Sequence, residues 1–295
     1  MTAPRIQVAF QGALGAYSEL AAREFFPEEI EVAPEVTFDE VFEKVEAGAV
    51  PYGIVPIENS LAGSIHQNYD LLLEHKLWIV GEIKLRIVHH LIVHPGVGLA
   101  DLRKVVSHPQ ALSQCRDFLR GLEGVEAVPV YDTAGAVRLI REEKAMDTGA
   151  IASAQAAEDY GLEILESGIE SNHENFTRFL IVARERKTQA QDPKTSIVFS
   201  AKNIPGALFK SLSVFALRDI DLLKIESRPL HGSPWQYLFY LDFEGDAEEE
   251  RCQRALGHLE EIATFLRILG SYEKGKVADG RLHKRRASSG QRKDR

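Results

Sequence analysis

The chain alternates between short apolar stretches with strand character and stretches with helical periodicity through its first 183 residues. An apolar strand pattern at Ile6–Phe10 is followed by a helical pattern at Tyr17–Phe26. Thr37 and Glu40 have the spacing of a capping box that opens a further helix. Repeated alternation of this kind is typical of α/β layers rather than of helical bundles or β-sandwiches. We therefore expect an α/β fold.

A polar segment divides the chain into two parts. Residues 184–193, R-E-R-K-T-Q-A-Q-D-P, have almost no large apolar groups and are typical of a linker. After it, strand and helix patterns follow in the order β-α-β-β-α-β over about 80 residues, which is the ferredoxin-like plan. We expect a larger domain at 1–184, a linker at 185–193 and a ferredoxin-like domain at 194–273. The stretch 274–295 has nine basic and two acidic residues without apolar periodicity, which predicts a disordered basic tail.

Composition excludes several classes of protein. The formal net charge of −9 and a pI near 5.6 argue against a nucleic-acid partner, which requires clustered basic charge. Cys115 and Cys252 lie far apart and lack metal-ligand spacing, so the sequence predicts neither a disulfide framework nor a zinc site. No apolar run approaches the roughly 20 residues of a membrane span. We expect a cytoplasmic protein with no membrane partner.

Residues 77–94 have one long strand-like pattern, which suits a chain crossing between the two halves of a cleft. His89 and His90 are adjacent there, so on a strand they face opposite sides and cannot share a metal ion. No third ligand has useful spacing. We predict structural histidines and no metal or other cofactor.

The stretch Ser171–Phe179, S-N-H-E-N-F-T-R-F, runs directly into the apolar residues 180–183. Such a segment is typical of a loop that delivers polar side chains to a sheet edge. The hydroxyl of Thr177 and the guanidinium of Arg178 suit an anionic ligand. An equally open alternative is that Thr177 is an ordinary strand residue and that Arg178 pairs with a neighbouring acid.

Two further polar stretches stand where a strand pattern gives way to a helix. Glu58, Asn59 and Ser60 follow one strand pattern, and the stretch from Ser107 to Gln114 follows another. Open α/β sheets place ligand groups at such points. The alternative is that these residues serve only as turn and cap residues. His108, within the second stretch, is an acid or base candidate or a structural residue.

The motifs together resemble a known family. They are G-A-L-G-A-Y-S at 12–18, P-I-E-N-S at 56–60, S-H-P-Q at 107–110 with Gln114, N-F-T-R-F at 175–179, and G-A-L with E-S-R-P in the second domain. In this order the chain resembles a monofunctional prephenate dehydratase with a C-terminal ACT regulatory domain, over residues 5 to 272. No chorismate mutase segment is expected before Ile6. The resemblance implies a two-lobed, periplasmic-binding-like catalytic domain at 1–184.

The resemblance also implies an activity and its residues. Prephenate would lose carbon dioxide and its ring hydroxyl to give phenylpyruvate in L-phenylalanine biosynthesis, with arogenate as the rival substrate. The implied catalytic residues are Thr177, Glu58, Asn59 and Gln114, and the implied substrate-binding residues are Ser60, Ser107, Arg178 and Phe179. We expect Thr177 to donate to the departing hydroxyl, with Glu58 as the rival acid.

In the second domain the resemblance implies allosteric binding of L-phenylalanine and a homodimer or homotetramer assembled through ACT domains. The implied effector residues are Asn203, Pro205, Gly206, Ala207, Leu208, Glu226, Ser227, Arg228 and Pro229. Phe209 departs from the small aliphatic residue expected after Gly-Ala-Leu, which bears on effector preference. Without the resemblance, these stretches are helix-cap and strand-end residues. A binding protein for small acids and an ACT-bearing regulator are the alternatives to an enzyme.

Overall fold

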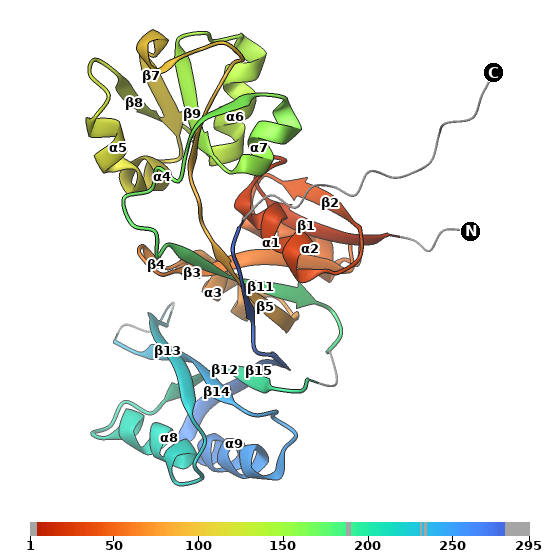
Figure 1. The fold of residues 1–295 in the computed structure, drawn as a ribbon. Helices are drawn as coiled ribbons and strands as arrows, with labels where there is room; N and C mark the ends of the chain where they lie inside the picture. The colour runs from red at the N-terminus through yellow and green to blue at the C-terminus, as the bar shows by residue number, and fades with distance from the viewer. Residues whose placement is uncertain (1–4, 187–189, 231, 233–234, 281–295) are drawn as a thin grey trace, which may run out of the picture.

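The computed structural model describes residues 5–186, 190–230, 232 and 235–280, and these form three sheets with helices packed on them (Figure 1). Two of the sheets belong to two lobes of the first domain. The third, with helices α8 (Ala207–Ala216) and α9 (Glu250–Ile262), lies against the end of the lobe that carries the N-terminal strands (Figure 1). Within the described residues, no helix has the length and apolar character needed to cross a bilayer.

The first lobe has a sheet in the order β16-β5-β11-β3-β1-β2, with β4 paired to β3. β1, β2 and β3 are parallel, and β11 runs antiparallel between β3 and β5. Its elements are β1 (Ile6–Gln11), α1 (Tyr17–Phe25), β2 (Ile30–Glu35), α2 (Phe38–Glu46), β3 (Tyr52–Asn59), β4 (Gly63–Ser64), α3 (His66–Glu74), β5 (Trp78–Arg86), β11 (Phe176–Ala183) and β16 (Lys276–Ala278).

The capping box predicted at the start of α2 is confirmed. The Glu40 amide donates to Thr37 Oγ1 at 3.2 Å, and the Glu40 carboxylate accepts from the Thr37 amide at 3.3 Å. Both contacts satisfy amides that have no partner within the helix. The helix then buries Val41, Phe42 and Val45 against the sheet.

The second lobe has a sheet in the order β10-β6-β9-β7-β8. The chain passes between the lobes at 87–89 and again at 168–175, and the two crossings are hydrogen-bonded to each other. Its elements are β6 (His90–Val93), the short 3₁₀ helix Leu99–Asp101, β7 (Lys104–Ser107), α4 (Pro109–Gln114), α5 (Arg116–Arg120), β8 (Glu126–Pro129), α6 (Thr133–Glu143), β9 (Thr148–Ala152), α7 (Ala154–Tyr160) and β10 (Glu163–Ser167).

The strand-like run at 77–94 crosses between the two halves as predicted, but as two strands instead of one, because β5 and β6 belong to different sheets. The break lies at the first crossing, where backbone groups bond to the second crossing instead of to a neighbouring strand. The Ile87 amide donates to the Asn175 carbonyl at 2.8 Å, and the Gly168 amide donates to the His89 carbonyl at 2.9 Å.

The third sheet has the order β13-β14-β12-β15, and every neighbouring pair is antiparallel. With two helices on one face, this is the predicted ferredoxin-like plan, which is confirmed. The other face joins the first lobe, where Val198, Tyr240 and Leu269 share one core with Leu72 and Ile79. The elements are β12 (Pro193–Ala201), α8 (Ala207–Ala216), β13 (Leu222–Pro229), β14 (Tyr237–Glu244), α9 (Glu250–Ile262) and β15 (Ala263–Glu273).

The predicted disordered tail contains a strand. β16 pairs in parallel with β5, at the edge of the first lobe's sheet, and the Gly275 amide donates to the Glu82 carboxylate at 2.9 Å. The prediction failed here because an unpaired sheet edge, and not the local sequence, orders these residues. Residues 281–295, the rest of the predicted tail, lie outside the described part of the chain.

The third sheet approaches the first lobe backbone to backbone at Gly270. A Cβ atom at this position would lie 2.1 Å from the carbonyl oxygen of Ile79 on β5. Only glycine permits this approach, because a main-chain oxygen within a sheet cannot rotate away as a side chain can. Gly257, in the middle of α9, has open space around the corresponding position.

We predict that Gly270→Ala lowers the free energy of unfolding by about 1–3 kcal/mol, because the two backbones must separate to admit the methyl group. Urea denaturation followed by circular dichroism measures the change. Gly257→Ala is the control, and we expect it to raise stability by about 0.5–1 kcal/mol, since glycine is unfavourable within a helix. Equal stability of the two variants would contradict the close approach.

Candidate active site

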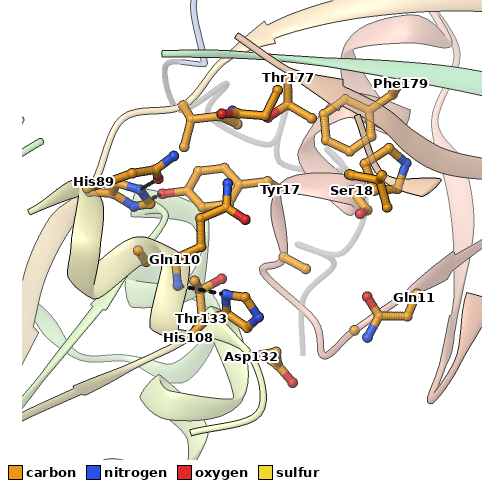
Figure 2. Close-up of a pocket in the computed structure, with 18 of the residues that line it drawn as sticks. Gln11, Tyr17, Ser18, His89, His108, Gln110, Asp132, Thr133, Thr177 and Phe179 are labelled. Atoms are coloured by element: carbon orange, nitrogen blue, oxygen red, sulfur yellow. Dashed lines mark hydrogen bonds between the residues drawn. The ribbon is translucent and has the colours of Figure 1, made fainter. Parts of the chain in front are cut away.

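A cavity of about 400 Å³ lies between the two lobes of the first domain (Figure 2). Its walls come from the ends of β1 and β3, the start of α1, the crossing at 87–89, α4, the start of α6 and β11. The lining residues with polar side chains are Gln11, Tyr17, Ser18, Asn59, His89, His108, Gln110, Gln114, Tyr131, Asp132, Thr133 and Thr177. Phe179 is among the apolar ones.

Asn59 fixes the hydroxyl group of Thr177. The two residues are direct partners in the pairing of β3 with β11, and Asn59 Nδ2 donates to Thr177 Oγ1 at 3.0 Å. The same amide donates to Asn175 Oδ1 at 2.8 Å, while its oxygen accepts from the amides of Leu61 and Ala62. These contacts fix the positions of the nitrogen and the oxygen of the Asn59 side-chain amide. Because Thr177 Oγ1 accepts from Asn59, its own proton is available to a ligand in the cavity.

A second group of hydrogen bonds joins the two lobes through the first crossing. His89 Nε2 lies 2.8 Å from Gln114 Oε1 of α4, and His89 Nδ1 lies 2.9 Å from the Tyr17 hydroxyl of α1 (Figure 2). Burial lowers the pKa of His89 despite the Gln114 contact, and burial raises the pKa of Tyr17 well above its usual value. Both side chains are therefore neutral at pH 7. Within the described residues, no group of three His, Cys, Asp or Glu side chains is placed to hold a metal ion.

The structure brings four of the predicted site residues, Asn59, Gln114, Thr177 and Phe179, to this cavity. Ser60 and Ser107 are not among its lining residues. The Ser60 hydroxyl donates to the Glu174 carbonyl at 2.8 Å, and the fully buried Ser107 hydroxyl donates to the Ile151 carbonyl at 2.6 Å. Each serine therefore forms a hydrogen bond that stabilises a backbone segment beside the cavity.

The structure places Glu58 and Arg178 on the opposite face of the sheet. Glu58 lies within β3, not on the predicted turn, and its carboxylate pairs with Lys224 of β13 at 2.9 Å. Neighbouring residues of β11 point to opposite faces, so Thr177 faces the cavity and Arg178 faces the third sheet. Arg178 Nη1 pairs with Asp242 of β14 at 2.7 Å. The alternative that Arg178 pairs with an acid is therefore the one observed.

Arg178 is part of a compact charge cluster of two cations and two carboxylates. Lys194 Nζ lies 2.7 Å from Glu82 and 3.1 Å from Asp242, and Arg178 lies 3.6 Å from Glu82. Burial alone would raise the pKa of Asp242. The charges of Arg178 and Lys194 and the hydroxyl of Ser196 outweigh burial and hold that pKa well below its usual range. These four side chains have balanced charge and join the first lobe to the third sheet, and Arg178 Nε also lies 3.8 Å from Glu58.

The nine predicted effector residues lie in two stretches, the loop and helix start after β12 and the end of β13, and only some of them contact the first lobe. Glu226 and Arg228 face the first lobe, where the Ser64 hydroxyl donates to Glu226 at 2.6 Å and Arg228 pairs with Asp70 at 2.5 Å. Ser227, on the other face of β13, is exposed. The other predicted effector residues are Asn203, Pro205, Gly206, Ala207, Leu208 and Pro229. Helix α8 begins at Ala207 instead of at the predicted Pro205.

Tyr17, Ser18 and Asp132 line the cavity but were not predicted as site residues from the sequence. Tyr17 and Ser18 lie in the G-A-L-G-A-Y-S stretch, directly after a strand and at the start of α1, which was the available signal. Asp132 is the N-cap of α6, and its Oδ1 accepts from the amide of Gly135. A capping role is sufficient to explain an aspartate before a helix, so the pattern alone did not indicate a ligand.

We predict that Asp242→Asn lowers the free energy of unfolding by about 3–5 kcal/mol at pH 7, because it leaves two buried cations with only one of the two carboxylates that they share. Urea denaturation measures the loss. Asp117→Asn is the control, since the Asp117–Arg120 pair is exposed, and such pairs contribute about 0–1 kcal/mol. The folded pKa of Asp242 lies below its unfolded value of about 3.9, so its contribution is complete above that pH and lost as pH falls further. A wild-type advantage that stays constant down to pH 3 would contradict this account.

The fold and the cavity together define a two-lobed α/β protein with a hydrogen-bonding ligand site between its lobes. The family described as prephenate dehydratase matches residues 8–187. Arogenate dehydratase 2 of Petunia hybrida is 51% identical over 284 residues, which cover 91% of this chain and 72% of the relative. Arogenate dehydratase/prephenate dehydratase 2, chloroplastic, of Arabidopsis thaliana is 52% identical over 279 residues, covering 91% and 73%. The chain belongs to the prephenate dehydratase family of enzymes.

Two solved structures have the same fold. Prephenate dehydratase from Arthrobacter aurescens in complex with L-Phe matches with a TM-score of 0.84 and 31% identity, covering 91% of this chain and 90% of that one. GqqA, described as a novel type of quorum quenching acylase, matches with a TM-score of 0.84 and 38% identity, covering 91% and 98%. These matches extend over nine-tenths of this chain, and they confirm the α/β fold predicted from the sequence.

Proposed function

We propose that the protein removes carbon dioxide and water from prephenate to give phenylpyruvate, and that the same chemistry converts arogenate to L-phenylalanine. The observation that carries this proposal is the Thr177 hydroxyl, which Asn59 holds as an acceptor so that its proton is directed to a ligand. Membership of the prephenate dehydratase family and the two relatives named above support it.

The reaction breaks two bonds of the cyclohexadiene ring. The electron pair of the bond to the ring carboxylate enters the ring as carbon dioxide leaves, and the bond to the hydroxyl breaks on the opposite ring carbon. The hydroxyl takes up one proton and departs as water. Thr177 donates a hydrogen bond to it, and because aromatisation supplies driving force, orientation and electrostatic placement suffice for a weak acid. Glu58 is not the acid in this scheme, because it pairs with Lys224 on the far face of the sheet.

The substrate carboxylates need donors, and the described lining contains no lysine or arginine. Backbone amides take that role where two helices begin at the cavity. The N-cap of α1, Ala16, has no side-chain capping bond, and Tyr17 and Ser18 follow it in the cavity wall. Thr133 opens α6 on the other side. Free amides and the helix dipole both favour a carboxylate at such positions.

Amide hydrolysis, suggested by the similarity to GqqA, is less well supported by the same geometry. An acylase that used Thr177 as its nucleophile would need a general base within reach of that hydroxyl. Among the described residues, the side-chain partner of Thr177 Oγ1 is the Asn59 amide nitrogen, which donates and cannot accept the proton. Such a hydroxyl is arranged to donate to a ligand, as the dehydration requires.

We predict that Thr177→Val lowers kcat for dehydration by at least 100-fold, because valine keeps the shape of the residue and removes the donor. Thr177→Ser keeps the hydroxyl and is expected to retain activity within about tenfold, in line with the 10²–10⁴-fold effects of positioned proton donors. Formation of phenylpyruvate from prephenate and of L-phenylalanine from arogenate is measured for each purified variant. Near wild-type turnover by the valine variant would contradict the role of Thr177.

We further propose that the ferredoxin-like domain is an ACT domain that binds L-phenylalanine and controls the activity. For this proposal we keep the domain limits predicted from the sequence, with catalysis at 1–184, a linker at 185–193 and regulation at 194–273. Residues 187–189 of that linker lie outside the described part of the chain, and Pro193 is the first residue of β12. The complex of the Arthrobacter aurescens relative with L-Phe supports an effector of this kind. The loop after β12 and the end of β13 lie at the same end of the sheet, since β14 residue Leu238 pairs with both Ser200 and Arg228.

The same domain is proposed to assemble the protein into a homodimer or homotetramer. Large apolar side chains are exposed on it, among them Phe209 at 76% and Leu217 at 77%. Covering such side chains with a second copy would remove apolar surface from water. The cytoplasmic location expected from the sequence stays a prediction, because the Arabidopsis thaliana relative is described as chloroplastic.

We predict that L-phenylalanine raises the melting temperature of the protein and that D-phenylalanine does not, because a ligand that binds only the folded state stabilises it. Gly206→Val is expected to reduce the shift. Gly206 has a φ of 76°, which a β-branched residue adopts only with strain, so the loop before α8 must change shape. Differential scanning calorimetry measures both effects. An undiminished shift in the variant would place the binding site elsewhere.

A further inference from the structure

The cavity contains a carboxylate that the proposed reaction does not use. Asp132 is the one acidic residue among the described lining residues, and no lysine or arginine accompanies it there. Burial lowers the pKa of both lining histidines, His89 and His108, and for His108 it outweighs the opposing effect of the Asp132 charge, so neither supplies a positive charge at pH 7. A site that receives carboxylate substrates therefore has a negative charge of its own, which is unfavourable unless the substrate offers a matching cation.

Capping of α6 does not account for that charge. The cap uses Oδ1, which accepts from the Gly135 amide, while Oδ2 accepts no hydrogen bond from the described residues. Asparagine and serine cap helices about as well as aspartate does. The negative charge of Asp132 is thus available for a second role, on a side chain that is partly exposed to the cavity.

Asp132 and Thr177 lie at opposite ends of the cavity. Figure 2 shows Thr177 on one side of the lining residues and Asp132 on the other, with Tyr17 and Gln110 between them. Thr177 comes from β11 of the first lobe, and Asp132 precedes α6 of the second. In both proposed substrates the leaving hydroxyl and the three-carbon side chain are attached to opposite carbons of the ring. When the hydroxyl is at Thr177, the side chain therefore extends towards Asp132.

The two substrates differ in that side chain alone. Arogenate has an α-ammonium group where prephenate has a keto oxygen. A carboxylate forms a charge-assisted hydrogen bond with an ammonium group, and it repels a keto oxygen, which can only accept. Both effects are stronger in a partly enclosed cavity than in water.

We propose that Asp132 is a specificity-determining residue, whose carboxylate binds the α-ammonium group of arogenate and disfavours prephenate. This inference rests on the proposed dehydratase function and deepens it by naming the preferred substrate class, an amino acid. The side-chain carboxylate, common to both substrates, is held by the backbone amides at the start of α6 and by neighbouring hydroxyls. Asp132 does not touch the reacting carbon–oxygen bond, so it affects which substrate is bound and not how the bond is broken.

The test compares kcat/KM for arogenate and prephenate in wild type, Asp132→Asn and Asp132→Ser. Wild type is expected to prefer arogenate. Both variants keep the cap and are expected to lower kcat/KM for arogenate by at least 30-fold while leaving that for prephenate unchanged or raised. Asp101→Asn is the matched control, because Asp101 also accepts from a backbone amide in the second lobe but does not line the cavity. Its ratio of the two kcat/KM values is expected to equal that of wild type.

Three results would overturn the inference. They are a wild-type preference for prephenate, an equal loss for both substrates in the Asp132 variants, and an arogenate kcat/KM that Asp132→Asn leaves unchanged. An equal loss would show that the residue serves the fold of the lobe and not substrate choice. Melting temperatures of the variants, measured alongside, show whether such a loss comes from instability.

A binding measurement separates this inference from the dehydratase proposal itself. Calorimetric titration of arogenate and prephenate into Thr177→Val, with and without Asp132→Asn, reports affinity while turnover is slowed at least 100-fold. If wild type converts neither substrate yet Thr177→Val binds arogenate in a manner that requires Asp132, the proposed function fails and the ammonium site stands. If wild type converts neither compound and neither compound binds, both proposals fail.

Discussion

The buried ion pair between Arg178 and Asp242 joins the cavity-forming lobe to the ferredoxin-like domain. Arg178 is adjacent to Thr177 on β11, and alternation along the strand directs one side chain to the third sheet and the next to the cavity. The pairing of β11 with β3 has a register shift between Arg178 and Phe179, a place where a strand bends and re-aims its side chains. A short contact to Asp242 at that irregular point fixes the strand that carries the hydroxyl.

Glu82, Lys194 and Asp242 are buried, and an unpaired buried charge costs free energy. Their arrangement in the cluster explains how the charges are tolerated. Each cation lies near more than one carboxylate, so none of the buried charges depends on a single partner. Replacing such a group by apolar residues is often neutral for stability in other proteins, which means that stability alone does not explain its presence. Its four side chains link the two domains at distances of 2.7 to 3.6 Å.

The sequence predicted well those features that local patterns encode. Strand and helix periodicity, the Thr37–Glu40 capping box and the βαββαβ order depend on neighbours a few residues apart, and all three are present. The residues whose positions the sequence predicted wrongly are positioned by contacts with residues that are distant in the chain. The residues around Arg178 and Glu58 in the sequence do not indicate that a second domain covers their face of the sheet. The residues around Lys276 do not indicate that β5 has an unpaired edge. Asp132 escaped notice because the same residue type serves both helix capping and ligand binding.

The pairing of β16 with β5 means that the ferredoxin-like domain is attached to the first lobe at both of its ends. The chain enters the domain after β11 and, having left β15, returns to the same sheet that β11 belongs to. A domain connected by one linker can swing through a wide arc, whereas one anchored at two points can only pivot about the line that joins them. Both connections lead into the sheet that contains β5 and β11, so the chain itself restricts how the domain can move relative to the cavity.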